Sequence, residues 1–90
     1  MDEIEDSWTP ATEDAATEAA VLRQVLDLHP VLVTAPELVL EIAGESPSFA
    51  ERDAIERAVR DLTGAGLLHS HEAFLLPTRA ALRFSELLDR

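Results

Sequence analysis

Apolar residues recur at three- and four-residue steps from Asp14 to His29, which is the spacing of one face of an α-helix. Polar residues occupy the opposite side of this predicted helix. The stripe consists of Ala15, Ala19, Leu22, Val25, Leu26 and His29. Pro30 ends the helix, because proline lacks a backbone N–H and clashes with the preceding turn. The run Val31–Val33 predicts a short strand that pairs with a later one.

Two capping boxes mark the starts of a second and a third helix. Thr34 stands three residues before Glu37, and Ser48 stands three residues before Glu51. Each pair can satisfy backbone N–H groups that are left free at a helix start. The second helix is short and ends at Gly44. The third buries a stripe made of Ile55, Ala58, Val59 and Leu62.

The segment "GLLHSHEAFLLPT", residues 66–78, follows a glycine break and predicts a β-hairpin. Alternate residues of a strand share a face, so His69 and His71 are expected on the same side. We expect residues 70–73, most of them polar, to form the loop.

The return strand of this hairpin is expected to turn Phe74 and Leu76 toward the interior. Thr78 then caps a last helix, because threonine is a common residue at that position. The apolar stripe of this helix consists of Ala81, Phe84, Leu87 and Leu88.

The predicted order of elements is helix, short strand, helix, tight turn, helix, hairpin and helix. This order makes a mainly α protein with a small β-hairpin, an α+β fold. The segment "AIERAVRDLTGAGLL" (Ala54–Leu68) resembles the third helix of the winged helix-turn-helix family where it runs through glycine into the wing. The segment "FLLPTRAALRFSELL" (Phe74–Leu88) is similar to the return strand of the wing and the helix after it. The resemblance covers residues 15–88 and implies a three-helix core plus a wing and a C-terminal helix. We therefore expect one winged-helix domain at residues 15–90 and an acidic, disordered tail at residues 1–14.

The same resemblance implies a DNA-binding domain of the transcription-regulator type. In this family the third helix enters the DNA major groove, which gives that role to Ser48–Thr63. The wing and the start of the last helix would contact phosphate. The candidates for DNA contact are Arg52, Arg57, Arg60, His69, His71, Arg79 and Arg83.

The charge of the chain argues against DNA as the ligand. Eighteen acids stand against seven bases, all of them arginine, and the net charge is −11. DNA repels a strongly acidic protein at long range. On the third helix, arginines and acids alternate at four-residue steps, which predicts a lattice of exposed ion pairs. The alternative is therefore a winged-helix module for protein–protein interaction or dimerisation that does not bind DNA.

Under this alternative, large apolar side chains at the ends of the chain supply the interface. Ile4 and Trp8 stand four apart in the acidic tail, so a helical turn would place them on one face. Trp8 either anchors a partner or packs within the chain, and both readings stand. The interface candidates are Ile4, Trp8, Leu28, Phe84 and Leu88.

The sequence offers little chemistry for catalysis. The absence of cysteine excludes disulfides and thiolate sites. His69, His71 and Glu72, with His29 as a distant further ligand, are a weak metal pattern, and a solvated loop explains them better. Ser70 points away from both neighbouring histidines, and no phosphate-binding glycine loop is present. We expect a non-enzymatic protein without cofactor, metal or small-molecule ligand. Acids at the N-terminus and the lack of a long apolar run favour a cytoplasmic location away from membranes.

Overall fold

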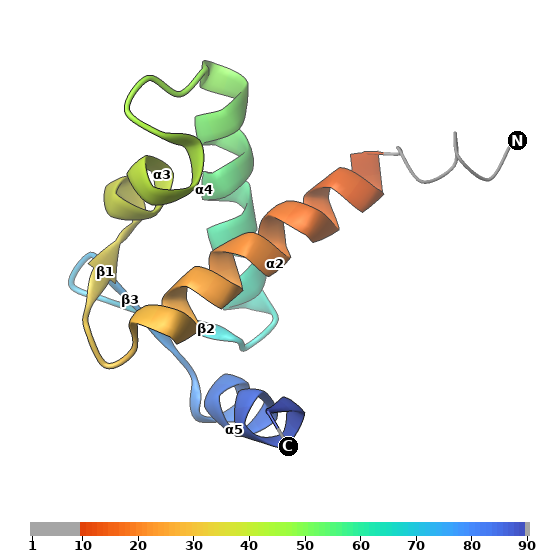
Figure 1. Cartoon of the computed structure of the whole chain (residues 1–90), viewed down its shortest axis with the longest axis vertical. Coiled ribbons are helices and arrows are strands. Elements are labelled where there is room, and N and C mark those ends of the chain that lie inside the picture. The colour runs from red at the N-terminus through yellow and green to blue at the C-terminus, as the bar shows by residue number, and fades with distance from the viewer. Residues whose placement is uncertain (1–9, 90) are drawn as a thin grey trace, which may run out of the picture.

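The computed structural model describes residues 10–89, with side chains from Glu13 onward. The elements run α2 (Pro10–Leu28), β1 (Val33–Thr34), α3 (Ala35–Ala43), α4 (Phe49–Gly64), β2 (Leu68–His71), β3 (Phe74–Pro77) and α5 (Arg79–Leu88). In Figure 1, α2 crosses in front of the lower part of α4, and α5 lies apart at the bottom of the molecule. The predicted order of elements and the mainly helical fold with a small antiparallel sheet are confirmed. None of the described helices combines the length and the apolar character that a bilayer crossing requires.

The first helix begins at Pro10, four residues before the predicted start. Proline suits the first turn of a helix, where its missing N–H would have no partner. Glu13 in the same turn adds a favourable negative charge at the positive end of the helix dipole. The helix ends at Leu28, two residues before the proline that was predicted to stop it. Residues 1–9 of the predicted tail lie outside the described residues.

Both predicted capping boxes are confirmed. The Thr34 N–H donates to Glu37 Oε1 at 2.7 Å, and the Ser48 N–H donates to Glu51 Oε1 at 2.9 Å. The side chains of Thr34 and Ser48 accept from the backbone N–H of the same two glutamates in return. Between the two helices Gly44 adopts a φ of +88°, which L side chains rarely reach. These contacts fix the start of α3 and of α4.

The strands form a three-stranded antiparallel sheet in the order β1-β3-β2. The predicted early strand does pair with a later one, but it spans Val33–Thr34, and Val31 before it is exposed. The prediction that Phe74 and Leu76 face the interior is wrong. Leu75 is the buried residue of β3, because it stands opposite the buried Val33 in the sheet register and shares its face.

The hairpin between β2 and β3 is tighter than predicted. Its strands reach His71 and Phe74, so the turn has only two residues, Glu72 and Ala73, rather than 70–73. Both have positive φ, 51° and 75°, as in the two-residue turns that match the twist of antiparallel strands.

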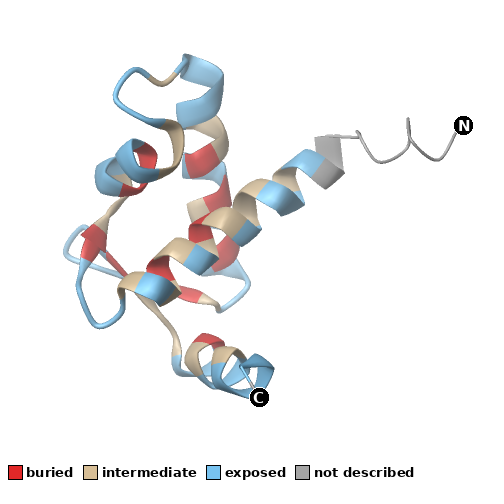
Figure 2. Ribbon diagram, in the orientation of Figure 1, coloured by how far each residue is buried: buried red, intermediate tan, exposed pale blue. Residues whose placement is uncertain are grey.

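The hydrophobic core draws residues from every element except α5. It consists of Val21, Val25, Val33, Leu38, Val39, Ile55, Ala58, Leu62, Leu68 and Leu75. Val59 packs against this cluster from α4, as its predicted stripe requires. On α5 only Ala81 is buried, and the other members of the predicted stripe are exposed, as Figure 2 shows for most of this helix. The apolar face of α5 is therefore only partly covered by the rest of the described molecule.

Candidate interaction surfaces

Helix α4 carries the three arginines predicted to contact DNA, all of them exposed. Arg57 is already engaged. Its Nε lies 3.3 Å from Asp53 Oδ2 in the same helix, and its Nη2 lies 3.7 Å from Asp14 Oδ1 of α2. A phosphate would have to displace these carboxylates. Arg57 therefore bridges α2 and α4, and its guanidinium group is not free to bind a ligand without losing these contacts.

The prediction of a lattice of ion pairs along α4 is wrong, because most of these pairs do not form. Among the described residues, only Asp53–Arg57 forms within the helix, and neither Arg52 nor Arg60 has a carboxylate within 4.0 Å. The physical reason is that an exposed pair gains little in water and loses side-chain entropy. Arg52 and Arg60 thus keep their charge available on the surface.

The surroundings of these two arginines are acidic. From Ala35 to Gly64, helices α3 and α4 with their turn hold seven acids and three arginines, a net charge of −4. Glu56 stands between Arg52 and Arg60 on α4 and is exposed. The helix pair that would face DNA therefore presents a negative surface to it.

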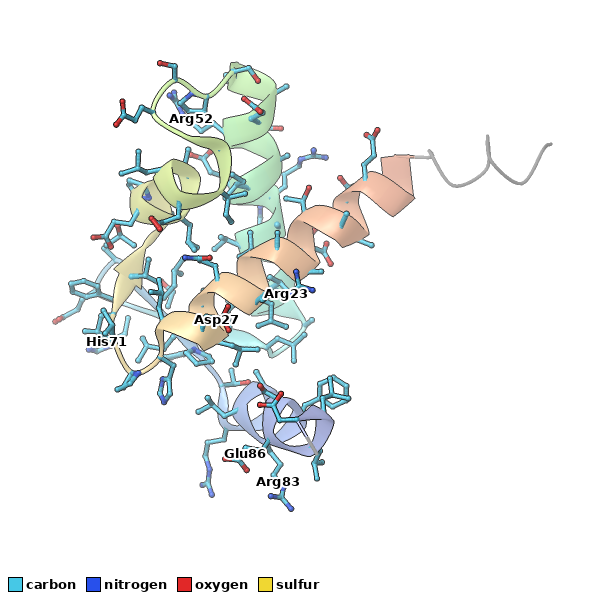
Figure 3. The ribbon with its side chains drawn as sticks, viewed as in Figure 1. Arg23, Asp27, Arg52, His71, Arg83 and Glu86 are labelled. Atoms are coloured by element: carbon cyan, nitrogen blue, oxygen red, sulfur yellow. The ribbon has the colours of Figure 1, made fainter. Side chains whose placement is uncertain are left out.

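The predicted DNA contacts do not gather in one place. Figure 3 shows Arg52 near the top of α4, His71 at the left edge on the hairpin, and Arg83 at the bottom on α5. Arg83 also pairs with Glu86 at 3.3 Å on its own helix. Arg79 begins the same helix, so it too lies in the separate α5 region. The candidates are therefore spread over three parts of the molecule, α4, the hairpin and α5.

The two histidines of β2 share the outer face of the hairpin, as predicted. Their ring centroids lie 6.5 Å apart with 16° between the planes, and both rings are exposed. His71 Nε2 lies 3.9 Å from Glu72 Oε1, which is an ion pair only when the imidazole is protonated. No group of three His, Asp or Glu side chains within the described part of the chain is arranged to hold a metal ion.

A small acidic cluster lies where α2 passes α4. Partial burial raises the pKa of Glu18, and the nearby carboxylates of Asp61 and Asp14 raise it further. The cluster stores like-charge repulsion at neutral pH, which Arg57 offsets from the Asp14 side.

A groove of about 390 Å³ runs between α2 and α5. Its walls are mainly apolar, and three charged side chains also line it. The lining residues are Ala19, Leu22, Arg23, Leu26, Asp27, Phe84, Ser85, Leu88 and Asp89. Phe84 is 58% exposed and Leu88 is 69% exposed, so the α5 wall of the groove is open to solvent. Both were predicted as interface residues on one helix, and both line the α5 side of this groove.

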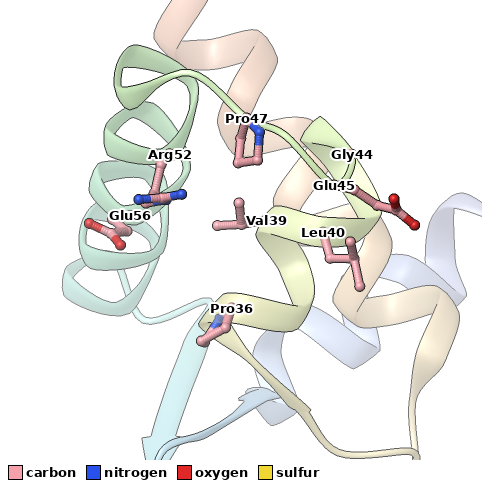
Figure 4. A pocket seen from close by; sticks show the side chains of 8 residues that line it. All are labelled: Pro36, Val39, Leu40, Gly44, Glu45, Pro47, Arg52 and Glu56. Carbon is pink, nitrogen blue, oxygen red and sulfur yellow. The ribbon is translucent and has the colours of Figure 1, made fainter.

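A second hollow, of about 360 Å³, lies between α3 and the first half of α4. In the close view of Figure 4, Val39 and Leu40 stand between Pro36 and Pro47, with Arg52 and Glu56 on the α4 side. Leu40 also lines a neighbouring groove with Val31 and Leu32, and all three are exposed.

The remaining interface candidates have different positions. Leu28 packs partly against the core, so it is less available than predicted. Ile4 and Trp8 lie outside the described residues. The exposure of Leu40 was missed by the sequence reading, although a nine-residue helix rich in apolar residues cannot bury all of its sides.

Comparisons with protein-family models, with curated proteins and with solved structures find no match to this chain.

Proposed function

We propose that this chain is a winged helix-turn-helix domain that serves as a protein-interaction module and does not read DNA. The scaffold part of the proposal is supported by the α3-turn-α4 pair, the β2–β3 hairpin that follows it, and a sheet that ties β1 to β3. This is the arrangement that the resemblance of Ala54–Leu68 and Phe74–Leu88 implies. Fold alone does not decide function, so the second part of the proposal depends on the surface.

The observation that carries the proposal is the charge of the helix pair itself. DNA-binding domains present a basic patch, since phosphate contacts supply most of the non-specific affinity. Here α3 and α4 with their turn carry −4, and Arg57 is held between Asp14 and Asp53. If DNA bound to this face, its glutamates would lie close to phosphate groups. Their carboxylates would lose solvation without gaining an oppositely charged partner. The surface therefore favours a protein ligand over a polyanion.

Exposed apolar side chains give the proposal its positive support. Single exposed apolar residues are ordinary, but here they gather beside hollows in two places, along α5 and around Leu40. Such grouping marks surfaces that another protein covers.

DNA binding remains the second candidate, and one observation favours it. Arg52 and Arg60 are exposed on the helix that would enter the groove, and neither is engaged by a carboxylate among the described residues. Two free guanidinium groups are enough for weak, salt-sensitive phosphate contact.

A titration of mixed-sequence duplex DNA at low salt, followed by fluorescence anisotropy, separates the two candidates. The proposal predicts no saturable binding at protein concentrations up to about 100 μM, where even weak non-specific DNA-binding domains associate. The double variant Arg52→Ala with Arg60→Ala serves as the matched control and should give the same flat curve.

Saturable binding by the parent chain would refute the proposal. Loss of that binding in the double variant, with a steep decrease as salt rises, would establish α4 as the DNA-contacting element instead.

A further inference from the structure

We propose that the groove between α2 and α5 docks a second copy of this chain, which forms a two-fold dimer over Phe84 and Leu88. This inference rests on the proposed function and names the partner. It begins from α5, a ten-residue helix with a single buried residue, Ala81. Thr78 anchors the start of this helix by donating to the Gly66 carbonyl at 2.7 Å and accepting from the Ala81 N–H at 3.2 Å. The helix is thus held in place while most of its apolar face is uncovered.

The apolar surface is shared by two elements. Phe84 and Leu88 of α5 face the groove, and Leu22 and Leu26 of α2 line its other wall and are only partly buried. Leu87, also on α5, is 55% exposed and extends this surface. A copy that inserts the same side chains into the same groove covers all of them at once, as a two-fold interface requires.

Charge selects a second copy over other occupants. Residues 1–65 contain fifteen acids and four arginines, a net −11, whereas residues 66–90 contain three of each and are neutral. Two copies that approach through their acidic parts repel each other. The charged residues that line the groove itself, Arg23, Asp27 and Asp89, sum to only −1, so two copies can meet there at little electrostatic cost. A basic partner would instead be drawn to the acidic α3–α4 side.

The groove is lined by charges of both signs, Arg23 and Asp27 on α2 and Asp89 at the end of α5. Arg23 and Asp27 can complement each other between two copies, and neither forms an ion pair within the described part of the chain. Figure 3 shows both residues on the C-terminal half of α2. If two α2 helices cross antiparallel about an axis level with Val25, Arg23 of one copy stands opposite Asp27 of the other. These charges therefore fit a copy of the same groove better than a partner of one sign.

The size of this surface indicates a moderate affinity. Stable interfaces bury about 800 Å² on each partner, and one short helix with one wall of α2 offers no more than that. We expect dissociation constants on the order of 10 μM, at the weak end of specific complexes.

Sedimentation equilibrium over about 1–500 μM protein tests the dimer, a range that brackets this expected constant. The variant Phe84→Ser should weaken association at least tenfold, because it removes the largest apolar side chain of the groove. The matched control is Phe49→Ser on α4, where the phenylalanine is 81% exposed and away from the groove. This control should associate like the parent chain.

A charge-swap series tests the pairing of Arg23 with Asp27 and does not depend on α5 remaining folded. Arg23→Asp and Asp27→Arg should each weaken the dimer several-fold. The double variant should restore it, because the opposite charges face each other again with exchanged signs. Circular dichroism of every variant shows whether its helices are intact. If Phe84→Ser unfolds α5, the charge-swap series alone decides whether the dimer forms through this groove.

Three results would overturn the inference: a parent chain that stays monomeric over the whole range, equal association of Phe84→Ser and parent, or a double charge swap that fails to recover association. Failure here is distinguishable from failure of the proposed function. A monomer that ignores DNA refutes the dimer alone, whereas a dimer that binds DNA through Arg52 and Arg60 refutes the proposed function alone.

Discussion

Replacing Leu38 by alanine should destabilise the fold far more than the same replacement at Leu40, two residues along helix α3. Leu38 is 0% exposed and lies in the core, whereas Leu40 is 52% exposed beside the α3–α4 hollow. Residue type, substitution and helix are the same at both sites. The change in helix propensity therefore cancels, and the comparison isolates burial.

The expected magnitudes follow from the two exposures. Leucine to alanine removes about three methylene equivalents, or roughly 2.4 kcal/mol of transfer free energy at full burial. At Leu38 a cavity adds to this, which gives about 3–5 kcal/mol. At Leu40 about half of the transfer term applies and solvent fills the space, so about 1 kcal/mol is expected. A domain of this size has about 5–13 kcal/mol of total stability, so Leu38→Ala removes a quarter of it or more.

Urea denaturation followed by circular dichroism measures both variants. The difference of at least about 2 kcal/mol corresponds to a gap of roughly 8–16 °C between their melting temperatures. The dependence on urea should keep the same slope, since the surface exposed on unfolding hardly changes. Equal destabilisation of the two variants, or a larger loss at Leu40, would refute the packing of α3 described above.

Three further changes test local features. Ser48→Ala should destabilise the chain by about 1 kcal/mol in urea denaturation, because the N-cap of α4 is lost; no loss would mean that the capping box is not formed. Replacing Glu72 by asparagine and Ala73 by glycine should raise stability by about 1 kcal/mol, since both positions have positive φ; a lower melting temperature would contradict the two-residue turn. The raised pKa of Glu18 means that folding favours its protonated form, so this contribution is present at low pH and is lost as pH rises through the raised value. Glu18→Gln should therefore stabilise the chain by about 0.2–1 kcal/mol at pH 7, a gain that shrinks as the pH falls into the carboxyl range; a gain that is independent of pH would contradict the repulsion from Asp61.

Local signals in the sequence were enough for the helices that begin with a cap. Thr34 and Ser48 each carry their own partner three residues away, so the start of α3 and α4 depends on nothing distant. The hairpin was also a local prediction, since a short, mainly polar segment separates the apolar residues of its two strands, although its turn is shorter than predicted.

The face of a strand could not be predicted with the same certainty. A shift of one residue exchanges the two faces, and Phe74, Leu75 and Leu76 are all apolar. The pairing of Leu75 with Val33, which is more than forty residues away in the chain, decides the register. No local pattern contains that information.

The candidate surfaces were likewise predictable only in their local features. The sequence placed Phe84 and Leu88 on one helix face, but their exposure depends on how α5 meets the rest of the molecule. The ion pairs predicted along α4 failed because spacing brings side chains within reach without making contact favourable in water. The bridge from Arg57 to Asp14 of α2 depends on tertiary packing and was not predictable.

The most direct test of the proposed interaction module is a set of amide ¹H–¹⁵N spectra of the parent chain, recorded on dilution and again with duplex DNA at low salt. We expect that dilution moves resonances of residues 19–27 and 82–89, and that DNA leaves those of Phe49–Gly64 unchanged. Spectra that do not depend on protein concentration, together with DNA-induced shifts along Phe49–Gly64, would contradict this proposal.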